Sequence, residues 1–218
     1  MERTSQWGDK ASRPGAGPPF PTTLDPAIRP LGMSDEALKL LVLDLDETLI
    51  FASEAPLPRP ADFFTGRYHV YKRPFVDEFL QRVRAWFRLA VWTSSSPSYA
   101  KAVVGQLFPE PSDLAFVWAS DRCTVVFDPD SLEHYKTKKL EKLRRKGYRL
   151  ESVIVVDDSP EKHRSAYGNL VRVSPYTGDP VDDELPKLMA YLEQLRHVPN
   201  VRGVEKRGWR TRDDRREE

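Results

Sequence analysis

Acidic side chains follow two of the apolar runs in this chain, at the point where each run ends. Asp44-Leu45-Asp46-Glu47-Thr48 follows Leu40–Leu43, and Asp157-Asp158-Ser159 follows Val153–Val156. A hydroxyl-rich segment, Thr93-Ser94-Ser95-Ser96, follows a third run. If the runs are parallel strands of one sheet, their carboxyl ends bring these side chains together, where a ligand would bind. Carboxylates packed at one edge repel each other unless a cation lies between them.

The residue types in this cluster indicate a divalent cation and a phosphate group. Oxygen ligands without histidine suit Mg²⁺ rather than zinc. Hydroxyl groups at the start of a helix form a seat for phosphate, and Ser96-Pro97 has the residue types of an N-cap and a first helical position. Together these features suggest phosphoryl transfer. Taken singly, an Asp after a strand is often only a helix cap, and a Ser/Thr run is often only a polar strand exit.

The elements that must position these residues are predicted from the spacing of apolar side chains. Strands are expected at 40–43, 88–92, 124–127 (a short strand or hairpin arm), 153–156 and 170–173. Helices are expected at 74–87, from 97 to about 108, at 137–147 and at 182–195. This alternation predicts an α/β fold whose mostly parallel sheet is covered by helices on both faces.

Composition and charge narrow the class of protein. The 218 residues include 34 Lys and Arg against 33 Asp and Glu, a net charge of +1, which argues against a general nucleic-acid binder. The single cysteine excludes an internal disulfide and a Cys-rich zinc site. No apolar run is long enough to cross a bilayer, and no signal peptide is recognisable. We expect a soluble, monomeric protein in the cytoplasm, or in the nucleus if the source is eukaryotic, without direct membrane or nucleic-acid contacts.

Three segments are expected along the chain. Residues 1–36 are rich in Pro and Gly and predict a disordered leader. Residues 37–198 carry the alternating elements and form the predicted domain. Residues 199–218 mix both charges around Trp209 and predict a solvated charged tail.

The first acidic segment resembles a known signature. Asp44-Leu45-Asp46-Glu47-Thr48 matches the D-x-D-x-T motif of phosphatases of the haloacid dehalogenase superfamily, and its surroundings resemble the FCP/SCP-type (NLI-interacting-factor-like) branch, which dephosphorylates the RNA polymerase II C-terminal domain. Five further matches follow in order at 72–80, 91–94, 121–123, 138–143 and 155–160. The resemblance covers roughly residues 38–197. It implies a Rossmann-like fold with a minimal cap.

The resemblance implies a role for each acidic residue. Asp44 would attack phosphorus and form an aspartyl-phosphate, and Asp46 would be the general acid and then the base for water. Mg²⁺ would be held by Asp44, by the backbone carbonyl of Asp46 and by Asp157. Asp158 stands where relatives have Asn or Asp, which implies a further metal or neighbouring role.

The phosphate and substrate contacts are implied in the same way. Thr93 and Ser94 would hold phosphate oxygens, and Lys138 matches the family lysine, although the neighbouring Lys136 and Lys139 leave the register open. The resemblance also assigns Thr48 and Arg122 to the substrate side. Cys123 is expected to serve packing. The four histidines, at positions 69, 134, 163 and 197, are scattered, and none is expected to be catalytic.

The segment Phe51–Lys72 bears on substrate size. It is long enough only for a flap or hairpin, whereas relatives that act on small metabolites carry a larger cap. An open site suits a phosphoserine or phosphothreonine of a protein or peptide. A phosphatase for nucleic-acid ends or small esters remains an alternative. A non-catalytic binding module of the same fold is another alternative. It is disfavoured by the presence of Asp44, Asp46, Thr93, Lys138 and Asp157.

Overall fold

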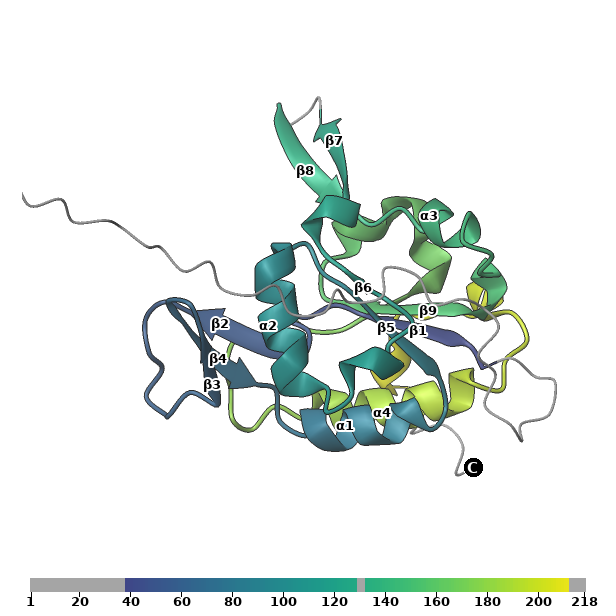
Figure 1. Ribbon diagram of the computed structural model, residues 1–218. Helices are drawn as coiled ribbons and strands as arrows, with labels where there is room; N and C mark the ends of the chain where they lie inside the picture. Colours follow the sequence, from purple (N-terminus) through teal and green to yellow (C-terminus); the bar gives the residue numbers. More distant parts are fainter. Residues whose placement is uncertain (1–37, 129–131, 212–218) are drawn as a thin grey trace, which may run out of the picture.

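The computed structural model describes residues 38–128 and 132–211 (Figure 1). The predicted leader therefore lies wholly outside the described residues. Within the described part of the chain, no helix combines the length and the apolarity that crossing a membrane requires.

A parallel sheet of five strands lies at the centre of the fold, in the order β10-β9-β1-β5-β6. Its strands are β1 (Leu40–Leu43), β5 (Arg88–Trp92), β6 (Val117–Trp118), β9 (Val153–Asp157) and β10 (Leu170–Arg172). Leu43 lies beside Val91 on one side and Val156 on the other. This register aligns the carboxyl ends of β1, β5 and β9, which confirms the predicted α/β class.

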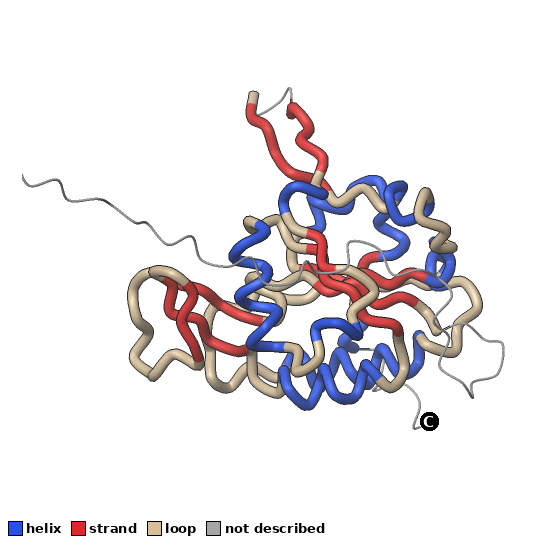
Figure 2. The backbone as a smooth tube through the Cα atoms, in the orientation of Figure 1, coloured by secondary structure: helices blue, strands red, loops and turns tan. Residues whose placement is uncertain are grey.

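Helices cover both faces of the sheet (Figures 1 and 2). One face packs against α1 (Val76–Arg84), α2 (Pro97–Leu107) and α4 (Glu184–Leu195), and the other packs against the short α3 (Glu141–Arg144) and the 3₁₀ segment η4 (Pro160–Asn169). Leu41 and Leu43 of β1 point into the first layer, and Leu40 and Val42 into the second. Because side chains alternate along a strand, a strand buried on both faces must be apolar throughout, as β1 is.

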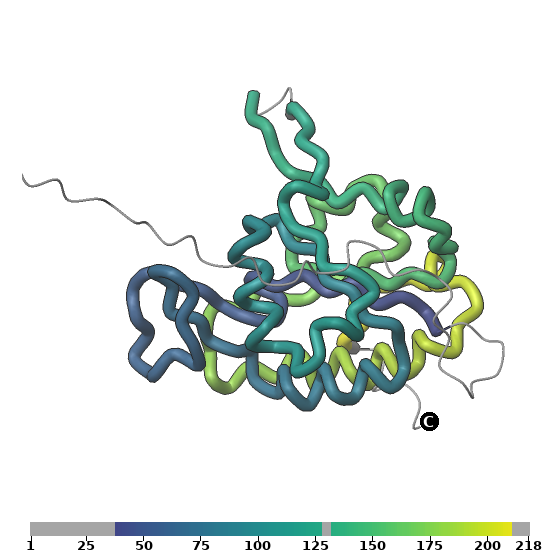
Figure 3. The backbone as a smooth tube through the Cα atoms, viewed as in Figure 1, coloured from purple at the N-terminus to yellow at the C-terminus, as the bar shows by residue number. Residues whose placement is uncertain are grey.

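Two small antiparallel units extend from this core (Figures 1 and 3). The segment predicted as a flap forms a three-stranded sheet of β2 (Ile50–Ser53), β3 (Phe63–Thr65) and β4 (Tyr68–Lys72), in the order β2-β4-β3. A hairpin of β7 (Thr124–Asp128) and β8 (Glu133–Thr137) projects on another side of the molecule. Short 3₁₀ turns, η1 (Pro111–Asp113), η2 (Ser120–Arg122), η3 (Leu150–Ser152), η5 (Val201–Gly203) and η6 (Trp209–Thr211), complete the described elements.

The predicted helix at 137–147 is wrong over its first half. Thr137 ends β8, where it pairs with Thr124, and only Glu141–Arg144 is α-helical. The backbone N–H of Lys138 donates to the carbonyl of Lys162 rather than to a helical partner. Tertiary pairing of the hairpin therefore outweighs the local helical pattern.

The expected solvated tail differs from the structure over residues 201–211. Trp209 is only 3% exposed, stacks on Tyr191 at 5.5 Å between ring centroids, and donates from Nε1 to the carbonyl of Arg172 at 2.7 Å. The guanidinium of Arg210 pairs with the buried carboxylate of Glu184. The ring and the indole N–H of Trp209 thus anchor a segment whose charged residues alone suggest that it is solvated.

Candidate active site

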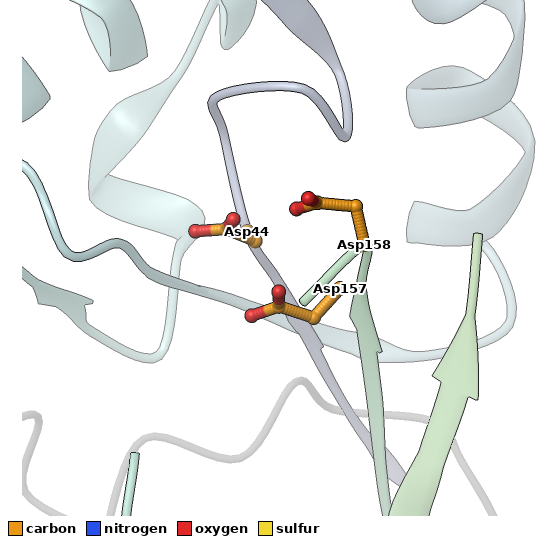
Figure 4. Close-up of side chains that lie close together, drawn as sticks. All are labelled: Asp44, Asp157 and Asp158. Carbon is orange, nitrogen blue, oxygen red and sulfur yellow. The ribbon is translucent and has the colours of Figure 1, made fainter. Parts of the chain in front are cut away.

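Three buried carboxylates meet at the carboxyl ends of β1 and β9 (Figure 4). One oxygen from each of Asp44, Asp157 and Asp158 lies within 4.8 Å of the other two. Asp44 directly follows β1, and its backbone N–H donates to the carbonyl of Val156 at 3.0 Å, which continues the strand pairing. The sheet register therefore brings together two acidic segments that are more than a hundred residues apart.

A buried lysine bridges two of these carboxylates. Nζ of Lys138 donates to Oδ1 of Asp44 at 2.7 Å and to Oδ2 of Asp157 at 2.5 Å, and the side chain is 1% exposed. Lys136 instead points to the carbonyl of Ser94, at 3.1 Å, and Lys139 is exposed. Of the three neighbouring lysines, Lys138 is the one that the structure brings into the cluster.

Two residues of η4 complete the surroundings of the cluster, and the sequence pattern did not indicate either. Nε2 of His163 lies 2.9 Å from Oδ2 of Asp157, and both side chains are fully buried. Nζ of Lys162 lies 4.0 Å from Oδ2 of Asp44. The available signal was the Pro at 160, because a 3₁₀ turn that begins so soon after Asp157 returns its side chains toward that residue.

The two bridged carboxylates differ in their affinity for protons. Burial, with the neighbouring Asp157 charge, raises the pKa of Asp44 to about 7, against the opposing effect of Lys138. Burial would also raise the pKa of Asp157, but Lys138 and His163 together hold that pKa below its ordinary value. Burial alone would lower the pKa of Lys138, whereas both carboxylates raise it, so this lysine stays charged.

Asp46 is oriented toward the start of α2. Its Oδ1 accepts from the Tyr99 hydroxyl at 2.6 Å, and its Oδ2 accepts from the Ser95 hydroxyl at 2.6 Å and from the Thr93 hydroxyl at 3.5 Å. Ser96 caps α2 by accepting from the backbone N–H of Tyr99, as its predicted N-cap role requires. This cap fixes the first turn of α2. Because Tyr99 lies in that turn, the cap helps to place the Tyr99 hydroxyl beside Asp46.

The remaining predicted residues lie at different distances from the cluster. The buried Thr48 hydroxyl donates to Oδ1 of Asp158 at 3.3 Å, and the Ser159 hydroxyl donates to the other oxygen at 3.0 Å. The side chain of Arg122 is 45% exposed and its guanidinium lies near Asp121, at 3.6 Å. The Cys123 thiol donates a weak hydrogen bond to the carbonyl of Thr93 at 3.7 Å.

Comparisons with known proteins matched a family model and curated relatives. The family model described as "NLI interacting factor-like phosphatase" matches residues 39–202. Phosphatase Herzog of Drosophila melanogaster is 31% identical over 210 residues, which cover 93% of this chain and 56% of that protein. CTD nuclear envelope phosphatase 1B of Danio rerio is 34% identical over 181 residues, which cover 76% of this chain and 70% of that protein.

A solved structure supports the fold. The structure of Fcp1, described as an essential RNA polymerase II CTD phosphatase, superposes with a TM-score of 0.53 at 21% identity and covers 73% of this chain and 62% of that one. Among the curated relatives, the chain spans just over half the length of Phosphatase Herzog and a larger share of CTD nuclear envelope phosphatase 1B.

Proposed function

Because the chain belongs to the family of NLI interacting factor-like phosphatases, we propose that it is a Mg²⁺-dependent enzyme that removes phosphate from phosphoserine or phosphothreonine of a protein. The observation that carries the proposal is the position of Asp44. Its carboxylate lies at the end of the central strand, bridged by Lys138 and grouped with Asp157 and Asp158. The proposed nucleophile, the cation proposed to contact the phosphate and the oxygen ligands for a metal thus lie next to one another.

The donor set fits Mg²⁺. Three buried carboxylates outnumber the one buried lysine, and oxygen atoms are the ligands this ion prefers. Oδ2 of Asp157 already accepts from Lys138 and His163, and its Oδ1 accepts from the backbone N–H of Ser159. We therefore assign the metal to Asp44, Asp158 and the backbone carbonyl of Asp46. In this assignment Asp157 orients Lys138, whereas the resemblance implied that Asp157 is a direct ligand of the metal.

The chemical steps follow from these roles. An oxygen of Asp44 attacks phosphorus while the bond to the leaving alkoxide breaks, and Asp46 donates the proton that the alkoxide takes up. Asp46 then accepts a proton from the water that attacks the aspartyl-phosphate, which releases phosphate and restores Asp44. Bound Mg²⁺ supplies charge that reduces repulsion between the phosphate and Asp44. Lys138 supplies a fixed positive charge, and Thr93 and Ser94 offer donors to the phosphate oxygens.

The small size of the flap is an argument for a large substrate. The residues between β1 and α1 form only the three short strands β2, β3 and β4, so a separate cap domain is not built there. An open site offers few remote contacts to a small ester, whereas a peptide can place flanking residues on the surface. The names of the relatives, which include CTD phosphatases, also support a phosphoprotein substrate.

The name of one relative also bears on location. The relative from Danio rerio is named CTD nuclear envelope phosphatase 1B. The nuclear envelope is therefore the first place to look for this protein in a eukaryotic cell. The cytoplasmic or nuclear location and the monomeric state expected from composition stay predictions.

A substrate panel tests the proposed function. We expect turnover of 4-nitrophenyl phosphate and, with higher kcat/KM, of some phosphoserine or phosphothreonine peptides, compared with sugar phosphates and nucleoside monophosphates under saturating Mg²⁺. Asp44→Asn should lose several orders of magnitude in kcat while its circular dichroism spectrum stays unchanged. A clear preference for one small metabolite, without turnover of any phosphopeptide, would exclude the protein-phosphatase proposal.

A further inference from the structure

The hairpin of β7 and β8 presents apolar side chains to solvent. Val125 and Phe127 of β7 are 62% and 49% exposed, whereas Val126 between them is half-buried. Leu132, just before β8, is 74% exposed. The solvent face of an antiparallel strand normally carries polar residues, so an apolar face indicates a surface that another molecule covers.

This apolar face is turned toward Thr93 and Ser94, the predicted phosphate-binding residues, here called the phosphate seat. Strand pairing sets Val125 opposite Lys136 and Phe127 opposite His134, so these four side chains share one face. Nζ of Lys136 reaches the backbone carbonyl of Ser94 at 3.1 Å, which joins the face to the hydroxyl-rich segment after β5. The ring of Phe127 packs on that of His134, with 5.1 Å between centroids.

Contacts at the base and on the back of the hairpin agree with this orientation. The thiol of Cys123, directly before β7, lies 3.7 Å from the carbonyl of Thr93 and 4.0 Å from the hydroxyl of Ser94. On the opposite face, Tyr135 lies under the guanidinium of Arg164 from η4, at 5.4 Å. One face of the hairpin therefore continues the wall of the active site, and the other packs toward η4.

We propose that the face formed by Val125, Phe127, His134 and Lys136, here called the hairpin face, binds the substrate residues next to the phosphorylated one, and that an apolar substrate side chain covers Val125 and Phe127. This inference rests on the proposed function and adds the place of peptide recognition. The occupant is an extended phosphopeptide because the face begins at the phosphate seat itself, so a peptide held by its phosphate passes directly along it.

The spacing of the hairpin face sets the expected substrate pattern. Side chains two residues apart on a strand are separated by about 7 Å. The Phe127–His134 row therefore lies about two extended residues farther from the seat than the Val125–Lys136 row. Lys136 favours the phosphate or an acidic neighbour close to the seat, and the apolar contact follows beyond it. The favoured apolar residue should stand about two to four positions from the phosphoserine, on one side.

A peptide scan tests the inference with the full chain and saturating Mg²⁺. One leucine is moved through the five positions on each side of phosphoserine in a Gly/Ala peptide, and kcat and KM are measured for the unaltered chain and for the double variant Val125→Thr/Phe127→Thr. Threonine keeps strand propensity and removes apolar area. For the best leucine position, we expect the double variant to raise KM about tenfold, equivalent to about 1.4 kcal/mol. Its kcat should change less than twofold, and its kcat/KM for 4-nitrophenyl phosphate should be unchanged.

Matched variants separate this surface from others. Phe64→Thr on β3 and Val181→Thr alter residues that are also strongly exposed, at 67% and 81%, and should leave the leucine preference intact. Phe127→Leu keeps an apolar side chain and should keep KM within twofold. A leucine preference that survives the double variant, or is lost only in Phe64→Thr, would overturn the inference.

Failure of the proposed function would look different. If the unaltered chain turned over neither 4-nitrophenyl phosphate nor any peptide, the phosphatase proposal itself would be contradicted, and the hairpin face would lose its occupant with it. If the unaltered chain turned over both but showed no preference for any leucine position, only the inference about the hairpin face would be overturned.

Discussion

Nζ of Lys138 lies 2.7 Å from Oδ1 of Asp44, although 94 positions separate the two residues in the chain. The same ammonium group contacts Asp157, so one buried cation holds two buried carboxylates. The contact ties the loop that follows β8 to the end of the central strand β1. It makes Lys138 both an element of stability and, in the proposed mechanism, a partner of the phosphate.

Replacing this lysine should therefore affect stability as well as activity. Lys138→Met leaves two buried carboxylates without their cation, and breaking a buried ion pair in this way typically costs about 3–5 kcal/mol. We expect a loss of that order in the free energy of urea unfolding without metal, and at least a hundredfold loss of kcat/KM. Lys139→Met, which alters an exposed neighbour, is the matched control. Equal stability of the two variants would contradict the bridging role.

The role assigned to Asp46 predicts a dependence on the leaving group. Asp46→Asn keeps the size and shape of the side chain but cannot donate the proton to an alkoxide. The loss of rate in aspartyl-phosphate formation should be large for a phosphoserine peptide and much smaller for 4-nitrophenyl phosphate, whose leaving group needs little protonation. Single-turnover kinetics would separate this step from hydrolysis. Equal losses for the two substrates would remove Asp46 from the acid role.

Tyr99→Phe tests how Asp46 is held. The variant removes the hydroxyl that donates to Asp46 at 2.6 Å while it keeps the ring. We expect a smaller loss of rate than in Asp46→Asn, with the same bias toward the poor leaving group. A loss that is identical for both leaving groups would indicate that Tyr99 acts on the fold rather than on the acid.

Metal binding should depend on pH through Asp44. Its pKa of about 7 without metal means that the carboxyl is mostly protonated at pH 5 and mostly ionised at pH 8. Because Mg²⁺ must displace this proton, its apparent affinity should rise about tenfold per pH unit below about pH 7 and level off above it. Isothermal titration calorimetry at pH 5, 6, 7 and 8 measures the slope. An affinity that does not change across this range would contradict the raised pKa.

The raised pKa of Asp44 also affects the stability of the metal-free fold. A carboxyl whose pKa is raised on folding binds its proton more tightly in the folded chain, so its ionisation destabilises the metal-free fold. The contribution of Asp44 to the free energy of unfolding should therefore fall as the pH rises from about 4 to about 7 and stay constant above that. Comparing unfolding curves of the metal-free parent with those of Asp44→Asn isolates this contribution.

The docked C-terminal segment predicts a stability effect far from the active site. Trp209→Ala removes an aromatic side chain that is 3% exposed and stacked on Tyr191. Substitutions of this kind cost about 3–5 kcal/mol in well-packed cores. We expect a clear decrease in the urea midpoint, whereas Tyr167→Ala, at an exposed position, should change it little. An unchanged midpoint in Trp209→Ala would restore the solvated tail expected from charge.

The amino-acid sequence by itself determined four of the five strands of the central sheet and the acidic residues that end two of them. Leu40–Leu43 and Val153–Val156 are apolar throughout, which is the pattern of strands buried on both faces. The carboxyl ends of parallel strands meet at one edge, so Asp44 and Asp157 could be expected to meet there. Ser96-Pro97 likewise specified the start of α2, because capping is a local interaction.

Only the tertiary structure decided which side chains reach those carboxylates. Lys136, Lys138 and Lys139 are chemically alike, and the incorrectly predicted helix at 137–147 would have placed Lys138 and Lys139 on different faces. The pairing of β7 with β8 ends at Thr137 and leaves Lys138 as the lysine that enters the core. The contacts of His163 and Tyr99 depend in the same way on how separate segments pack, as does the burial of Trp209. Local pattern determines which element forms, but a contact between distant segments depends on packing geometry that no short stretch of sequence contains.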